Sequence, residues 1–246
     1  MPEQLWFTAL LNRTIGGPVN SLLQSLPPAF HPAHPEAPIS NAVAMEILVV
    51  GILIVFFLII RARLSVDKPR GVQHLAEMFN EFIGGQTEEV IGHHGRRFIP
   101  FLSSVFLFIL VCNLIGLIPG FESPTAEVFV PLGCAVVAFI YYNFHGLREQ
   151  GPIGYAKHFI GPIPALAPLM IPLEIISHLA RVMSLTVRLF ANMFAGDLVT
   201  MVFFSLIPLG IPVIFLLLHF GVSLLQAYIF TLLTTIYLAG AVAHEH

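Results

Sequence analysis

A stripe of polar side chains runs through an otherwise apolar stretch between residues 174 and 197. Its members recur every three or four residues, so on a helix they share one face; they are Glu174, Ser177, Arg181, Ser184, Arg188 and Asn192. A guanidinium keeps its proton in a protein, and at the centre of a bilayer an arginine costs about 2.5–3.5 kcal/mol on insertion scales. An arginine in such a stretch therefore needs a partner or a function.

Arg188 has no close acidic partner along its own helix. It lies 14 residues after Glu174 and nine before Asp197. At about 1.5 Å per residue, both separations are too long for a direct ion pair. A structural arginine that snorkels or forms an ion pair is the alternative, but the spacing favours a functional one.

An acid and a histidine are expected to meet beyond Arg188. The turn SLIPLGIP contains the helix breakers Pro208, Gly210 and Pro212. If two helices fold back about residue 208, Asp197 and His219 lie at the same depth, because each is 11 residues from it. Such a pair is typical of a proton relay, although a hydrogen-bonded packing histidine is the alternative.

By the same reflection, Arg188 is level with Gln226 or Tyr228. Glu174, Ser177, His178 and Arg181 lie at the opposite end of the polar stripe. The polar residues thus form two groups, an outer half-path and an inner half-path, with a fixed cation between them. Separated half-paths do not short-circuit a membrane potential as a continuous pore would.

The composition is that of an all-α polytopic membrane protein. Of the 246 residues, 57% are hydrophobic and 10% charged, and the mean hydropathy is +0.87. Soluble domains carry about 25% charged residues. The net charge of −3 shows no excess of basic residues of the kind that binds nucleic acid. Cys112 and Cys134 fall in apolar runs without metal-type spacing.

We expect an N-terminal tail over residues 1–40, with a short amphipathic piece at 5–26 and no cleaved signal peptide. A single membrane domain follows over residues 41–246. Its expected spans are 42–60, 98–118 and 128–144, then a hairpin of 172–206 and 213–243, and an amphipathic surface helix covers 71–92. The 35 residues from Pro172 would measure about 52 Å as one helix, so the hairpin must tilt steeply or bend. Pro172 suits a first helical turn, and residues 145–159 are expected to be a polar link.

Basic residues indicate the orientation. They gather between the first two spans and after the third, at Arg61, Arg63, Lys68, Arg70, Arg96, Arg97, Arg148 and Lys157, whereas the opposite side holds only Arg13. The positive-inside rule therefore predicts an N-terminus outside and a C-terminus in the cytoplasm. The pairs His31/His34 and His93/His94 could ligate a metal, but a solvated loop and a solvated helix face are favoured, so no metal site is predicted.

Two segments carry a family resemblance. The run SLTVRLFANMFAGDL, followed by LLQAYIFTLLTTIYL, closely resembles the a subunit of bacterial-type rotary ATP synthases. The likeness is strongest from Glu174 to His246 and extends more loosely to NLIGLIPG and LSVDKPRG. Asp197 stands where glutamate is commoner, and Ala191 where glycine is frequent.

The resemblance implies a role for each matching residue. Arg188 would face the carboxylate of a passing c subunit, with Asn192 and Gln226 as polar neighbours. Asp197 and His219 would form the outer half-channel, and Glu174 with Ser177 the inner one. It also implies a non-catalytic subunit without a cofactor, which works with a c-ring and with the b subunits of the peripheral stalk in a bacterial inner membrane. The acid–histidine pair favours H⁺ over Na⁺.

The main alternative is an ion-coupled secondary transporter, which usually shows paired inverted repeats that this sequence lacks. An intramembrane enzyme is disfavoured because neither HExxH nor GxSxG occurs.

Overall fold

The computed structural model describes residues 4–25, 27, 31, 37–64, 71–118, 120–160, 167–206 and 210–242, and most of these residues are helical. The helices in these ranges are α1 (Trp6–Gln24), α2 (Asn41–Arg63), α3 (Gly71–Ile91), η2 (His93–Phe98), α4 (Ile99–Ile115), η3 (Pro124–Ala126), α5 (Phe129–Ile160), α6 (Ala167–Leu206) and α7 (Ile211–Val242). The predicted turn at Pro208 lies outside the described residues, as do His34, Lys68 and Arg70.

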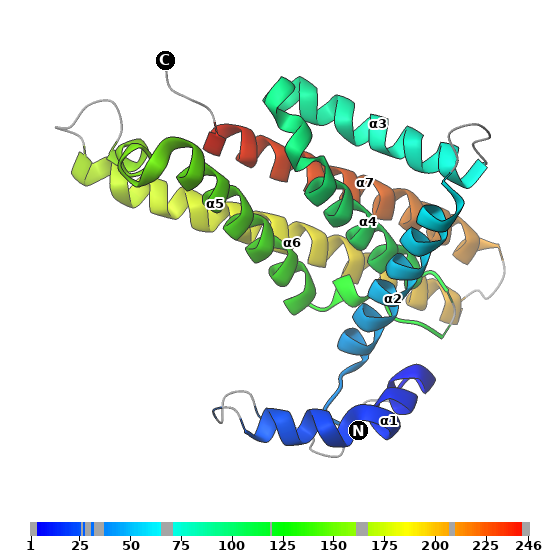
Figure 1. Cartoon of the computed structure of the whole chain (residues 1–246). Coiled ribbons are helices and arrows are strands. Elements are labelled where there is room, and N and C mark those ends of the chain that lie inside the picture. Colours follow the sequence, from blue (N-terminus) through cyan, green and yellow to red (C-terminus); the bar gives the residue numbers. More distant parts are fainter. Residues whose placement is uncertain are drawn as a thin grey trace.

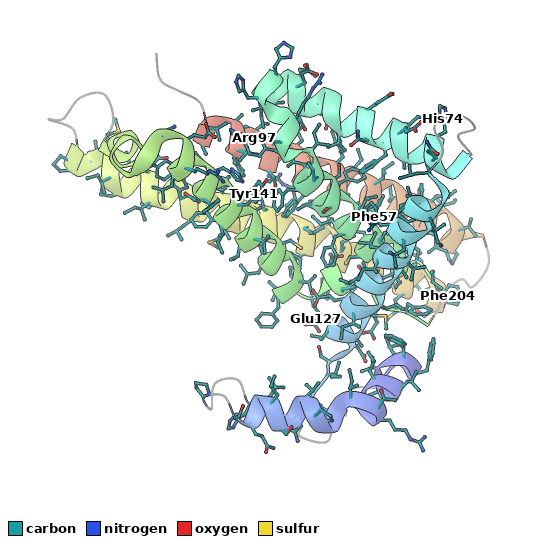
Figure 2. The ribbon with its side chains drawn as sticks, in the orientation of Figure 1. Phe57, His74, Arg97, Glu127, Tyr141 and Phe204 are labelled. Carbon is teal, nitrogen blue, oxygen red and sulfur yellow. The ribbon has the colours of Figure 1, made fainter. Side chains whose placement is uncertain are left out.

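Five helical stretches in the described ranges are long and apolar enough to cross a membrane. They are Asn41–Ala62, His93–Ile115, Phe129–Gly151, Pro168–Leu206 and Pro212–Val242. The expected all-α polytopic membrane fold is thereby confirmed. Apolar side chains point outward around the whole bundle, among them Phe57 of α2 and Phe204 near the end of α6 (Figure 2).

The long helices α6 and α7 run side by side as a hairpin that crosses the direction of α2 and α4 (Figure 1). On one side, α5 packs along α6, and α4 packs against α7. A single apolar core joins α3 through α7, with Phe106, Leu189, Phe230 and Leu238 nearly or fully buried in it. This core fixes the two members of the hairpin against each other.

The helices α1 and α3 lie at opposite ends of the bundle (Figure 1). Asn12 ties α1 to the start of α2, because its side chain both donates to Ile39 O and accepts from Ile39 N, each at 3.0 Å. At the other end, Gln86 of α3 donates to the Tyr228 hydroxyl of α7 at 2.5 Å. Both helices are amphipathic, as expected for elements at a membrane surface.

Two predicted boundaries are wrong. The segment 145–159 was expected to be a polar link, yet α5 continues through it to Ile160. Only a kink interrupts it, at Gly151, whose φ of 71° is a conformation that favours glycine. The segment is therefore helical on both sides of a break at Gly151, and this break lies within the predicted link.

The second wrong boundary is the start of α6. The helix begins at Ala167, so Pro172 lies inside it and not in its first turn. Since Pro172 comes only just after that turn, it removes a single helical hydrogen bond near the frayed end. The 40 residues of α6 correspond to about 60 Å, twice the thickness of the hydrocarbon core. A steep tilt of the hairpin stays a prediction that this length supports.

Candidate functional site

Arg188 lies near the middle of α6. Its Nη2 donates to Ser184 Oγ at 3.1 Å, one helical turn away. Among the described residues, no carboxylate oxygen lies within 4.0 Å of the guanidinium. The cation is therefore held by a neutral hydroxyl, and its charge is available to a group outside the chain.

The face of α6 around Arg188 is uncovered. An apolar row follows one side of it and is about half exposed or more; it comprises Ile176, Leu179, Met183, Val187, Phe194, Leu198 and Met201. Next to this row, Ser184, Ala191 and Ala195 are exposed and small. We call these residues together with Arg188 the α6 open face. Small residues let a neighbouring helix approach closely.

One turn beyond Arg188, an amide pair joins the two members of the hairpin. Asn192 Nδ2 donates to Gln226 Oε1 at 2.8 Å, and Gln226 is 2% exposed. The sequence placed Gln226 or Tyr228 level with Arg188. The structure brings Gln226 to Asn192 instead, and it turns Tyr228 toward α3.

Asp197 and His219 meet between α6 and α7. Asp197 Oδ1 lies 3.6 Å from His219 Nδ1, and His219 is 3% exposed. Gly196 leaves room for the imidazole, since a Cβ at this position would lie 3.1 Å from its Cε1 and Nδ1 atoms. His219 Nε2 has no hydrogen-bond partner among the described residues. The ring thus presents one nitrogen to the acid and keeps the other available.

Two pockets meet at His219. The larger pocket, which we call the outer pocket after the predicted orientation, has a volume of about 500 Å³ and is lined by Phe121, Glu122, Ser123, Asp197, Thr200 and His219 among others. A smaller one, of about 220 Å³, is lined by Asn192, Gly196, Thr200, Leu218 and His219 among others. Thr200 and His219 line both, so the two pockets adjoin at these side chains and the smaller one reaches Asn192.

Sequence reasoning missed Glu122 as a member of this site. It belongs to the short connection between α4 and α5, and its only signal was an acid between two apolar spans. Buried hydrogen bonds anchor that connection: Thr125 Oγ1 donates to Asn113 Oδ1 at 2.6 Å, and Asn113 Nδ2 donates to Ser223 O of α7 at 3.2 Å. The loop is therefore attached to the hairpin that carries Asp197 and His219.

At the other end of α6, Glu174 pairs with His178. The Glu174 Oε1 to His178 Nε2 distance is 3.4 Å, and His178 Nδ1 lies 2.9 Å from the Tyr142 hydroxyl of α5. The resemblance grouped Glu174 with Ser177, which is half-buried and precedes His178 in the chain. The structure thus joins Glu174 to His178 and, through His178, to Tyr142, which sequence reasoning did not single out.

Beyond the kink at Gly151, Tyr155 folds back on α5. Its hydroxyl donates to Asn143 Oδ1 at 2.5 Å. Burial raises the pKa of Tyr155, and the charges of Arg181 and Glu174 act on it in opposite directions. The phenol therefore stays protonated at neutral pH and keeps donating this hydrogen bond.

The predicted site residues thus lie in two separate clusters, one between α6 and α7 and one on α6 alone. Asp197, His219, Asn192 and Gln226 gather beyond Arg188, and Glu174 lies on the other side with Ser177 close by. Glu174 and Asp197 are 23 residues apart, about 35 Å along the helix. In the described ranges, no group of three or more His, Cys, Asp or Glu side chains is placed to hold a metal ion.

Comparison with known proteins identifies the family. A family model described as ATP synthase A chain matches residues 43–239. The chain is 56% identical to the ATP synthase subunit a of Koribacter versatilis (strain Ellin345), over the full length of both proteins. It is 55% identical to that of Solibacter usitatus (strain Ellin6076) over 86% of this chain and 91% of the relative. It is 43% identical to that of Sulfurihydrogenibium sp. (strain YO3AOP1) over 83% of this chain and 98% of the relative. A family model that spans most of the chain and relatives of this similarity together show that the chain belongs to the ATP synthase A chain family.

Proposed function

We propose that the chain is the stationary proton-conducting subunit of a rotary ATP synthase. Two offset half-channels carry protons to and from the carboxylates of the c-ring, and Arg188 separates them. The subunit itself makes no ATP. The observation that carries this proposal is a cation without an acidic partner among the described residues, on an uncovered helix face between two polar clusters.

The outer half-path begins at the outer pocket. A proton passes the Asp197 and His219 pair and neutralises a c-ring carboxylate, which then moves into the lipid. After rotation, a carboxylate that meets Arg188 is favoured in its ionised form, because a nearby cation stabilises the carboxylate. The released proton leaves by the inner half-path at Glu174 and Ser177. Each charge that crosses gains about 2.3 kcal/mol per 100 mV of membrane potential.

The partner at the α6 open face is the c-ring. The exposed apolar row allows contact with an apolar helix, and Ser184, Ala191 and Ala195 allow that helix to come near Arg188. Other exposed apolar surfaces, such as that of α2, are left for lipid and for the b subunits of the peripheral stalk.

We place the chain in the bacterial inner membrane, with the N-terminus outside and the C-terminus in the cytoplasm. The charged ends of the bundle support this orientation. Arg97 lies at the end that holds α3, and Glu127 lies toward the end that holds α1 (Figure 2). Positive charge at the α3 end agrees with a cytoplasmic surface. The transporter alternative has no support from the relatives, since the three described above are all named ATP synthase subunit a.

The decisive experiment replaces Arg188 in the assembled complex. In Arg188→Ala, we expect ATP synthesis and ATP-driven proton pumping to be abolished, because nothing favours the ionised carboxylate between the half-paths. Passive proton leak through the membrane sector should persist. The ATP-driven pumping and the passive leak are measured in inverted membrane vesicles with a pH-sensitive dye.

Arg96→Ala is the control for loss of a cation. The Arg96 side chain is 75% exposed, and its Nη2 lies 3.8 Å from Glu88 Oε2. Such an exposed ion pair contributes little, so coupled pumping should be close to wild type. Normal ATP-driven pumping by Arg188→Ala would contradict the proposed function.

A further inference from the structure

His178 bridges α6 and α5 beside the inner half-path. It is 7% exposed and Tyr142 is 2% exposed, so both side chains are buried. One ring nitrogen of His178 faces Glu174 Oε1 at 3.4 Å, and the other lies 2.9 Å from the Tyr142 hydroxyl. A carboxylate, an imidazole and a phenol therefore form one continuous polar chain.

The direction of these contacts depends on the tautomer of the imidazole. A neutral imidazole has one N–H donor and one acceptor nitrogen. When the Tyr142 hydroxyl donates to Nδ1, the proton of the ring is on Nε2 and points at Glu174. The bond that one nitrogen makes sets the tautomer of the other. Tyr142 thus determines what His178 offers to the carboxylate.

Aromatic packing holds the His178 ring in place. The rings of His178 and Tyr142 are stacked at a centroid distance of 5.9 Å, and Phe139 meets His178 edge-on at 6.0 Å. A ring enclosed in this way cannot turn freely, so its Nε2 keeps its aim at Glu174.

The charged and titratable groups around this cluster come from three helices. They are Tyr142 and Tyr155 from α5, Glu174 and Arg181 from α6, and Tyr237 from α7. Arg181 stacks over the Tyr237 ring at 5.2 Å, while His178 is the group that contacts Glu174.

We propose that His178, with its tautomer set by Tyr142, is the positioning residue of the inner half-path and aims Glu174 for proton exchange. In this arrangement His178 Nε2–H donates to one oxygen of the Glu174 carboxylate and leaves the other oxygen to accept the proton released from the rotor. The inference rests on the proposed function, in which Glu174 belongs to the inner half-path. It gives His178, which the sequence places at the same end of the polar stripe, a direct contact with Glu174.

The first test removes one hydroxyl in the intact ATP synthase. Tyr142→Phe keeps the stacked ring but loses the donor to His178. We expect ATP-driven proton pumping to slow roughly three- to tenfold, as fits the loss of one buried hydrogen bond. Its pH dependence should also change, and only when the pH is varied on the side to which Glu174 opens. The matched control is Tyr141→Phe, whose ring stacks on Phe101 at 3.6 Å; it should pump like wild type.

A second pair of variants tests which nitrogen matters. The amide of His178→Gln can replace the Nε2 donor toward Glu174, whereas the shorter amide of His178→Asn can replace only the contact at Nδ1. We expect His178→Gln to recover most of the pumping rate and His178→Asn to remain as slow as His178→Ala. Equal rates for the Gln and Asn variants would overturn the proposal.

The amount of subunit that copurifies with the complex shows whether each variant assembles. If the His178 variants do not assemble, the result for Tyr142→Phe decides whether the proposal holds. If the pH profile of Tyr142→Phe has the same shape as that of wild type and differs only in overall rate, Tyr142 and His178 contribute packing alone. Arg188→Ala is measured in parallel. If it pumps normally, the proposed function fails; if it does not and Tyr142→Phe equals wild type, only the role of His178 and Tyr142 fails.

Discussion

At the scale of a single residue, Gly196 sets the position of His219. Any side chain at 196 would approach the imidazole to about 3.1 Å, closer than most Cβ contacts. Gly196→Ala should therefore push the ring away from Asp197 and weaken a contact that involves a charged group. We expect proton transfer through the outer half-path to slow about tenfold, measured as ATP-driven acidification of vesicles, in which protons leave by this half-path.

Gly51→Ala serves as the control for Gly196→Ala. A Cβ at Gly51 meets nothing within 4 Å, and the residue also lies inside a membrane-spanning helix. It should leave both assembly and flux unchanged. If Gly196→Ala conducts protons as well as Gly51→Ala, the close approach of α6 to His219 does not affect proton transfer.

At the scale of elements, the connection between α4 and α5 is held by buried hydrogen bonds. Thr125→Val removes a hydroxyl from a fully buried position and leaves Asn113 Oδ1 without this donor. Such a loss costs about 1–3 kcal/mol. We expect a lower melting temperature of the complex and looser placement of Glu122, seen as faster labelling of a cysteine introduced at Glu122.

The matched variant for Thr125→Val is Thr14→Val. The Thr14 hydroxyl bonds carbonyls of its own exposed helix at 3.0 and 3.2 Å, so its removal leaves no buried group unsatisfied. Equal melting temperatures for the two variants would mean that the Asn113 network does not anchor the loop.

Some contacts between elements could be predicted from the sequence. Asp197 and His219 were matched by counting from a turn, because two antiparallel helices have the same rise per residue. The contact between Tyr142 and His178 could not be predicted in this way, because the two residues are 36 positions apart and meet only through the packing of α5 on α6. The extension of α5 to Ile160 was also missed, because a helix bonds its own backbone in water and in lipid alike.

At the scale of the whole molecule, the orientation can be tested with two cysteines. Ser21→Cys on α1 should react with a membrane-impermeant maleimide from outside, and His94→Cys on η2 only from the cytoplasmic side. Both positions are exposed. The natural Cys112 and Cys134 lie within α4 and α5 and should stay unlabelled. Labelling of Ser21→Cys and His94→Cys from the same side would contradict the predicted topology.

The placement of α1 gives the molecule a natural optical probe. Trp6 is the single tryptophan of the chain, and its ring meets Phe121 edge-on at a centroid distance of 6.1 Å. Phe121 belongs to the wall of the outer pocket, beside Glu122. Indole emission from the purified subunit therefore responds to rearrangement or wetting of that wall, so the external mouth can be followed by fluorescence without attaching a dye to this chain.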